Sequence, residues 1–138
     1  MRVLIVDDYP DTAETACELL RRAGHDCRSA TCGAEALAVA DVLKPELAIL
    51  DVGLPDIDGY ELRAALHSRL ANGPPYFVAL SGRTHALNAA LVVGFDACLL
   101  KPVGLAQLLR VVRLAQFEIH GSPMGKIVLQ RAEQRSAG

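Results

Sequence analysis

Acidic, hydroxyl and ammonium side chains stand at the ends of four apolar segments of the chain. The segments and their polar residues are 2–6 with Asp7 and Asp8, 47–50 with Asp51, 76–80 with Ser81, and 97–100 with Lys101. If the segments are parallel strands of one sheet, these residues share the edge formed by the carboxyl ends of the strands, where ligands bind in open α/β sheets. Three carboxylates, a hydroxyl and an ammonium group at one edge could hold a divalent metal and a phosphoryl group.

Asp51 is the residue that we expect to react. A carboxylate at an exposed strand end can accept a phosphoryl group and form an acyl phosphate. A single aspartate in this position is more often a helix cap or a loop residue. The matching polar groups at the other strand ends favour the reactive interpretation.

Asp7 and Asp8 are adjacent carboxylates at the end of the first apolar segment. Two such charges repel each other unless a cation lies between them. Mg²⁺ prefers oxygen ligands and retains several waters, so one or two carboxylates suffice to hold it. We therefore predict a metal site in which Asp8 is a direct ligand and Asp7 assists, partly through water.

Lys101 and Ser81 are the candidate partners of the phosphoryl oxygens. The lysine would act as a point charge and the serine as a hydrogen-bond donor. Lys101 precedes Pro102, and a cis peptide bond there would direct the ammonium back towards the site, whereas a trans bond would only kink the strand end. A solvated lysine and a turn-capping serine before Gly82 are the commoner roles of such residues.

The composition fits one domain with a sizeable core, because 51% of the 138 residues are hydrophobic. A net charge of −2 gives no electrostatic support for nucleic-acid binding. No apolar segment approaches the roughly 20 residues of a membrane span, and the chain begins almost directly on a strand. Four cysteines without a metal-binding spacing favour reduced thiols and a cytoplasmic protein.

Strand-like and helix-like segments alternate, which predicts an α/β fold built from βαβ units. The expected strands are 2–6, 27–30, 47–50, 76–80 and 97–100, and the expected helices are 11–23, 34–43, one ending near 70, 85–93 and 104–117. We expect one domain over residues 1–120. Residues 121–138 are polar and predict a flexible C-terminal tail, with a short extra element at 127–129 as the less favoured reading.

The residue pattern from 1 to about 117 resembles the receiver domain of two-component response regulators. The motifs that carry the resemblance are Asp7-Asp8, Asp51-Val52-Gly53-Leu54-Pro55 with Asp58-Gly59, Ser81-Gly82, and Lys101-Pro102. The resemblance implies a flavodoxin-like, doubly wound sheet of five parallel strands in the order 2-1-3-4-5, with five helices. The motifs Gly53-Leu54-Pro55 and Gly94-Phe95-Asp96 are closer to those of receivers that work with hybrid histidine kinases than to those of transcription-factor receivers.

The resemblance also implies a mechanism and partners. Asp51 would take a phosphoryl group from a phosphohistidine of a sensor histidine kinase or histidine phosphotransfer protein. Mg²⁺ would be held by Asp8, Asp51 and the backbone carbonyl of Gly53, with Asp7 assisting. Lys101 and Ser81 would bind the phosphoryl group, and Ser81 would pass the signal to a partner-binding face of the fourth helix, fifth strand and fifth helix. No nucleic acid or membrane is implied as a partner.

Three features depart from the family pattern. The family usually has an aromatic switch residue where this chain has Cys98, which cannot swing a ring. The interval from Ser81 to Gly94 is about two residues shorter than usual. The helix predicted over 85–93 is apolar nearly all round, whereas a surface helix is normally amphipathic, so we expect a partner or a homodimer contact to cover this face.

Two other functions compete with the phosphoacceptor. A Mg²⁺-dependent hydrolase that forms an aspartyl phosphate would need a general acid two residues after Asp51, where this chain has Gly53. A degenerate receiver could act as a binding module without phosphorylation. The altered Cys98 and the shortened fourth helix favour this reading, and the intact set of Asp8, Asp51, Ser81 and Lys101 opposes it. We therefore expect a phosphoacceptor that catalyses only its own phosphorylation and dephosphorylation, and not an enzyme with turnover.

Overall fold

The computed structural model of the protein describes residues 1–82, 94–120 and 127–128. They form one parallel sheet with strand order β2-β1-β3-β4-β5-β6. The strands are β1 (Arg2–Val6), β2 (Asp26–Ala30), β3 (Leu47–Asp51), β4 (Tyr76–Ser81), β5 (Ala97–Leu100) and β6 (Ile127–Val128). The helices are α1 (Pro10–Arg22), α2 (Gly33–Leu43), α3 (Gly59–Arg69) and α5 (Leu105–His120).

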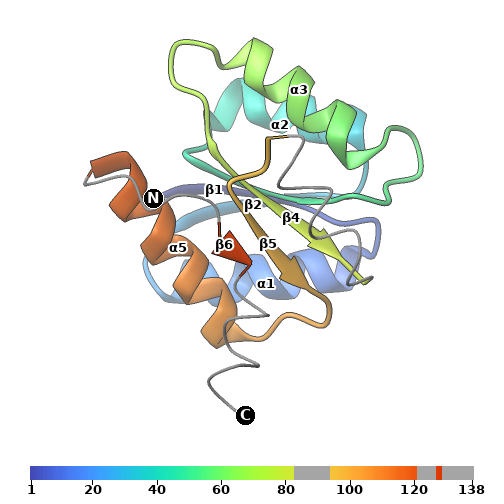
Figure 1. Cartoon of the computed structure of the whole chain (residues 1–138). Helices are drawn as coiled ribbons and strands as arrows, with labels where there is room; N and C mark the ends of the chain where they lie inside the picture. Colours follow the sequence, from blue (N-terminus) through green and yellow to red (C-terminus); the bar gives the residue numbers. More distant parts are fainter. Residues whose placement is uncertain (83–93, 121–126, 129–138) are drawn as a thin grey trace.

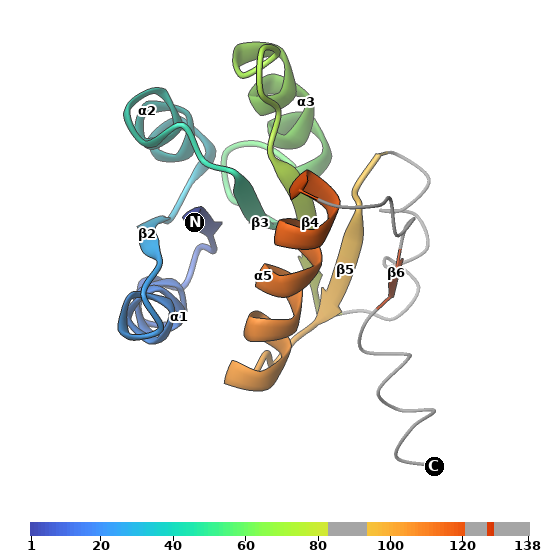
Figure 2. The same cartoon turned by 90° about the vertical axis from the view of Figure 1, so that its left-hand side faces the viewer.

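Helices cover both faces of the sheet, so the molecule has three layers (Figures 1 and 2). Helices α1 and α5 pack on one face, and α2 and α3 pack on the other. Successive strand residues alternate between these two cores: Val3 and Ile5 of β1 lie on the α1 and α5 side, and Leu4 and Val6 on the other. Because both faces are buried, the central strands β3 and β4 are nearly continuous apolar runs, whereas the edge strand β2 carries the polar residues Asp26, Arg28 and Ser29.

The strand order changes direction at β1, and this change positions the site. From β1 the chain goes to β2 at one side and then returns to β3 at the other side. Val6 of β1 pairs with Leu50 of β3, so the residues that follow them, Asp7 and Asp51, come side by side. Ligands bind at such a switch point in open α/β sheets.

The predicted order of the first five strands, 2-1-3-4-5, is confirmed. Four of the five predicted helices are present, and their ends lie within three residues of the predicted ones. The helix predicted over 85–93, the shortened interval before Gly94 and the homodimer contact expected there lie outside the described residues. None of the described helices is long and apolar enough to cross a membrane.

A sixth strand was the less favoured reading of the sequence, and the structure contains it. In β6, Ile127 and Val128 pair in parallel with Ala97 and Cys98 of β5. The predicted flexible tail therefore has one short element docked on the sheet edge. The rest of that tail lies outside the described residues.

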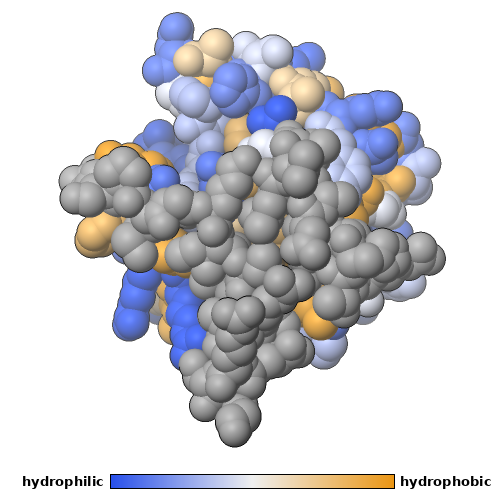
Figure 3. Space-filling model, in the orientation of Figure 1, coloured by the Kyte–Doolittle hydropathy of each residue, from blue (hydrophilic) through white to orange (hydrophobic). Residues whose placement is uncertain are grey.

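The described surface is largely hydrophilic on the face shown in Figure 3, with hydrophobic residues scattered over it. Three of the five exposed large hydrophobic residues among those described belong to α5: Leu105, Phe117 and Ile119.

Candidate functional site

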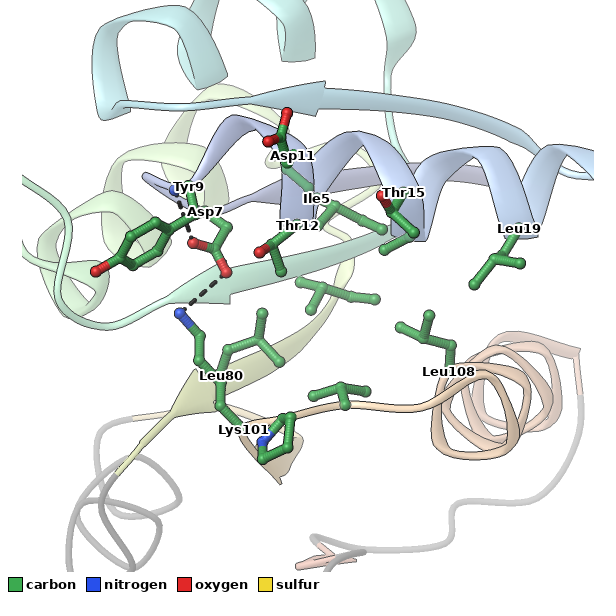
Figure 4. Close-up of a pocket in the computed structure, with 15 residues that line it drawn as sticks. Ile5, Asp7, Tyr9, Asp11, Thr12, Thr15, Leu19, Leu80, Lys101 and Leu108 are labelled. Carbon is green, nitrogen blue, oxygen red and sulfur yellow. Dashed lines mark hydrogen bonds and ion pairs between the residues drawn. The ribbon is translucent and has the colours of Figure 1, made fainter.

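The ammonium group of Lys101 joins two of the predicted carboxylates. Its Nζ lies 2.9 Å from Oδ2 of Asp7 and 3.0 Å from Oδ2 of Asp51. Lys101 follows β5, Asp7 follows β1 and Asp51 ends β3, so three strand ends meet at this point. Figure 4 shows the lysine reaching across to the Asp7 carboxylate.

Asp7 is almost completely buried, with 1% of its surface exposed. Its Oδ1 accepts a hydrogen bond of 3.0 Å from the backbone N–H of Tyr9, which opens helix α1. Its Oδ2 is buried, and its ion-pair partner is the lysine ammonium at 2.9 Å. Asp7 therefore holds a buried negative charge that needs a cation beside it.

Asp51 is held through both carboxylate oxygens. Oδ1 accepts a hydrogen bond of 2.9 Å from the backbone N–H of Gly53, and Oδ2 accepts one of 3.0 Å from Lys101. The family resemblance implied a role only for the carbonyl of Gly53, and the role of its N–H was not predicted. Aspartate side chains often accept a hydrogen bond from the backbone two residues further on, and this tendency was the available signal.

Asp8 completes a cluster of carboxylates. One oxygen each of Asp7, Asp8 and Asp51 lie within 4.8 Å of one another. Burial raises the pKa of Asp8 above its ordinary value, and the nearby Asp51 and Asp7 carboxyls raise it further. The carboxylates in this cluster repel one another. A bound cation would relieve that repulsion and stabilise the site. The donor set is all oxygen, partly accessible and acidic, so it fits Mg²⁺.

The lysine keeps its charge in this environment. Burial alone would lower the pKa of Lys101, but its contacts with Asp7 and Asp51 outweigh that effect and raise the pKa above its ordinary value. The Lys101–Pro102 peptide bond is cis. A permanently charged ammonium group is therefore available at the end of β5.

Ser81 and Cys98 lie on the neighbouring strands β4 and β5, and β5 leads directly to Lys101. Ser81 is buried at the end of β4, and its carbonyl accepts a hydrogen bond of 2.8 Å from the Lys101 backbone N–H. Cys98 is fully buried in β5, within the core shared with α2 and α3. Burial raises the pKa of its thiol to about 12, so it remains a neutral core residue.

The loop between β3 and α3 is held by side-chain caps. Asp58 accepts a hydrogen bond of 2.9 Å from the Glu61 N–H and so caps α3. Asp56 reaches the start of α2, where it accepts hydrogen bonds from the N–H groups of Gly33 at 2.8 Å and Ala34 at 3.1 Å. The loop that follows Asp51 is thus fixed at two helix N-termini, which favour negative charge.

Gly59 has a different role from the one its turn motif suggests. Glycine after aspartate is typical of turns that need a positive φ, but the φ of Gly59 is not positive. A Cβ atom at this position would lie 2.5 Å from Cα of Val52 and 2.7 Å from the carbonyl oxygen of Asp51. Glycine is needed because α3 begins in close contact with the backbone of the phosphoacceptor candidate.

A pocket of about 580 Å³ opens beside the carboxylates, between α1 and the segment from Lys101 to α5. Figure 4 shows Asp7, Tyr9 and Lys101 at one end, and Leu19 and Leu108 facing each other at the other. Thr12 and Thr15 of α1 are exposed at its rim. The pocket therefore joins a charged site to an apolar hollow on the α1 and α5 face.

The fold and site together define a flavodoxin-like α/β protein with an acidic, lysine-containing site at the switch point of its sheet. The chain belongs to the response regulator receiver domain family, whose model matches residues 3–113. The family resemblance noted in the sequence is thereby confirmed.

Relatives of two kinds share this domain. The chain is 31% identical over 108 residues to the sensor histidine kinase RcsC of Salmonella typhi, covering 78% of this chain and 11% of RcsC. It is 37% identical over 114 residues to the transcriptional regulatory protein PrrA of Mycobacterium tuberculosis, covering 81% of this chain and 48% of PrrA. The chain thus spans about a tenth of the first relative and half of the second.

Solved structures agree with this assignment. The chemotaxis response regulator CheY4 of Vibrio cholerae superimposes with a TM-score of 0.73 at 27% identity, covering 83% of this chain and 97% of CheY4. A response regulator from Clostridium difficile gives a TM-score of 0.75 at 23% identity, covering 88% of this chain and 99% of that one, and supports the fold alone.

Proposed function

We propose that this protein is the phosphoacceptor of a two-component phosphorelay and that Asp51 receives the phosphoryl group. The observation that carries the proposal is the contact of the Lys101 ammonium with both Asp51 and the buried Asp7. It places a permanent positive charge beside the carboxylate that would be phosphorylated. The donor would be a phosphohistidine on a sensor histidine kinase or on a histidine phosphotransfer protein.

The transfer is a single displacement at phosphorus. A carboxylate oxygen of Asp51 forms the new P–O bond, the P–N bond to the histidine breaks, and the imidazole leaves with the bonding electron pair. The N–H of Gly53 holds the Asp51 carboxylate in place through its other oxygen. Lys101 and the hydroxyl of Ser81 would then contact the phosphoryl oxygens, where charge accumulates.

Mg²⁺ is the metal that we propose for the carboxylate cluster. Asp8, Asp51 and the carbonyl of Gly53 would hold it, with Asp7 assisting, because the three side chains already offer oxygens within 4.8 Å of one another. When bound, Mg²⁺ supplies positive charge that offsets the repulsion between the carboxylates and the incoming phosphoryl group. The burial of the Asp7 carboxylate and the raised pKa of Asp8 support this assignment.

We propose that the phosphodonor domain approaches over the pocket between α1 and α5. The pocket opens onto Asp7 and Lys101 and offers an apolar hollow for side chains of the partner. The output would follow from a shift of Ser81 towards the phosphoryl group. Because Cys98 replaces the usual aromatic residue and is fully buried, the signal would pass by repacking of β5 and not by a ring rotation.

The test is phosphotransfer from a panel of phosphorylated histidine kinases and phosphotransfer proteins in the presence of Mg²⁺. We expect one equivalent of label on the wild-type chain and none on Asp51→Asn, with Asp41→Asn as a control because Asp41 is an exposed residue near the C-terminal end of α2, where it pairs with Arg69. Chelation of Mg²⁺ should abolish the labelling. Labelling that survives in Asp51→Asn would contradict the assignment of the acceptor.

The same samples separate the two alternatives. Release of many equivalents of phosphate from a small phosphomonoester would identify a hydrolase. A wild-type chain that binds neither the phosphoryl group nor beryllofluoride with Mg²⁺, measured by calorimetry, would instead be a phosphorylation-independent binding module.

A further inference from the structure

Two buried cysteine side chains meet between helix α1 and strand β2. The Sγ atoms of Cys17 and Cys27 are 2.6 Å apart, and the residues are 0% and 1% exposed. Cys17 lies in the middle of α1, and Cys27 pairs with Val3 in the sheet. Figure 2 shows α1 next to β2 at one side of the molecule.

Polar contacts at the surface hold these two elements together. Arg21 of α1 donates a hydrogen bond of 2.9 Å to the carbonyl of Cys27 and pairs with Glu14 at 2.7 Å. Ser29 of β2 donates to the other oxygen of Glu14 at 2.8 Å. The helix and the strand are therefore tied on both sides of the sulfur pair, and the two thiols stay in contact.

We propose that Cys17 and Cys27 form a redox modification site that closes to an intramolecular disulfide when the chain meets a small oxidant such as hydrogen peroxide. One thiol takes up an oxygen atom from the peroxide to give a sulfenic acid and one water. The sulfur of the second cysteine then attacks the sulfenic sulfur, and the hydroxyl group leaves as a second water with the proton of that thiol. Two electrons pass from the sulfur pair to the peroxide O–O bond.

Closure is slow in the folded chain. The contact with Cys17 and burial raise the pKa of the Cys27 thiol, so little of the reactive thiolate is present. Oxidant reaches the pair when α1 opens locally. Cys32 is partly exposed at the start of α2 and reacts without such opening, so the two sites differ in how their rates depend on denaturant.

The crosslink would change stability more than structure. It joins residues ten positions apart across the turn between α1 and β2, and it restricts the unfolded chain. A closed loop of this size should raise the melting temperature by roughly 5–10 °C, and the rise should disappear with dithiothreitol. It would also fix α1, which forms one wall of the pocket beside Asp7.

The test uses the full chain treated with hydrogen peroxide in 0, 1 and 2 M urea at concentrations below its unfolding transition, followed by tryptic mass spectrometry. We expect the peptides that carry Cys17 and Cys27 to become linked with the loss of two hydrogens, at a rate that rises with urea. Cys32→Ser and Cys98→Ser should retain the link, and Cys17→Ala and Cys27→Ala should lose it. Circular dichroism checks that the alanine variants are folded.

Three outcomes would overturn the proposal. The first is both thiols remaining reduced after α1 opens in urea. The second is their oxidation to separate sulfinic acids, and the third is linkage of either thiol to Cys32 instead. None of these readouts involves Asp51, so the proposal stands or falls independently of the phosphoacceptor function.

Discussion

The Lys101 ammonium lies 3.0 Å from Oδ2 of Asp51 and 2.9 Å from Oδ2 of the buried Asp7, so it bridges the two carboxylates. The residues come from the ends of β5, β3 and β1, so this one side chain fastens three strands of the sheet at their carboxyl edge. The contact stabilises the fold, because an unpaired buried carboxylate is costly.

Replacement of Lys101 should therefore destabilise the protein in the absence of metal. We expect Lys101→Met to lower the free energy of unfolding by about 1–3 kcal/mol, because it leaves Asp7 and Asp51 without a cation in a buried site. Urea denaturation in EDTA measures the change, and millimolar Mg²⁺ should restore part of it. Arg69→Ala removes an exposed ion pair with Asp41 and should cost less than about 1 kcal/mol. Equal effects of the two variants would contradict the structural role of Lys101.

Gly59 and Gly53 form a matched pair for testing the close packing below Asp51. Gly59→Ala places a methyl group within 2.7 Å of the Asp51 carbonyl and should destabilise the chain by about 2–3 kcal/mol. Gly53→Ala meets nothing nearer than Oδ1 of Asp51 at 3.7 Å and should leave the stability within about 0.5 kcal/mol. Thermal and urea unfolding check both values, and a Gly59→Ala variant as stable as Gly53→Ala would refute the packing argument.

Asp56 should make the stability of the folded protein depend on pH. Its hydrogen bonds from Gly33 and Ala34 lower its pKa in the folded state, so the folded protein binds a proton less readily than the unfolded chain. Its contribution is complete above the ordinary pKa of an aspartate and is lost as the pH falls towards the lowered value. Asp56→Asn should thus reduce the melting temperature at pH 7, and the difference from wild type should shrink as the pH falls below about 4.

The control for this experiment is Asp26→Asn. Asp26 is an exposed residue of β2, and it does not take part in the hydrogen bonds that join Asp56 to the start of α2. It should show little change in melting temperature at either pH. A difference for Asp56→Asn that is the same at pH 7 and pH 3 would mean that the charge of Asp56 does not support α2.

The sequence predicted most of the site because one geometric rule governs it. Parallel strands bring their carboxyl ends to the same edge, so polar residues after apolar segments must meet there. The β1 and β3 register then places Asp7 beside Asp51, as expected from the strand order. The carboxylates, the hydroxyl and the ammonium group at that edge could be predicted because each belongs to a side chain and so appears in the sequence.

The groups that sequence analysis missed are set by backbone conformation or by packing. The N–H groups of Tyr9 and Gly53 that hold the carboxylates belong to the main chain, and the only signal for them is the general tendency of aspartate to accept a hydrogen bond from the residue two positions further on. Cys17 and Cys27 have no recognisable spacing, and only the packing of α1 on β2 brings their sulfur atoms together. The two residues of β6 are too few for a periodic pattern, so their pairing with β5 depends on tertiary contact.

The β5 edge offers a prediction about self-association. Ile127 and Val128 occupy the outer side of β5 through parallel pairing with Ala97 and Cys98. Deletion of residues 121–138 removes this strand and leaves backbone groups of β5 available to another chain. We expect the truncated protein to associate at concentrations where the full chain does not, as measured by light scattering after size-exclusion chromatography. Val128→Pro, which removes one backbone donor from β6, should show a weaker effect in the same direction.

The pocket beside Lys101 gives a test that separates docking from chemistry. Thr12 and Thr15 are exposed residues of α1 that line this pocket. If a phosphodonor domain docks there, Thr15→Arg and Thr12→Arg should slow phosphotransfer from the protein donor at least tenfold, because a long charged side chain is costly to desolvate against an apolar hollow.

Phosphorylation by a small donor such as acetyl phosphate needs no docking, and its rate should stay within about twofold of wild type. Ser68→Arg, an exposed change near the C-terminal end of α3, is the matched control and should leave both rates unchanged. Equal slowing with both donors would place the effect at the site, and normal rates with both would show that the partner docks elsewhere.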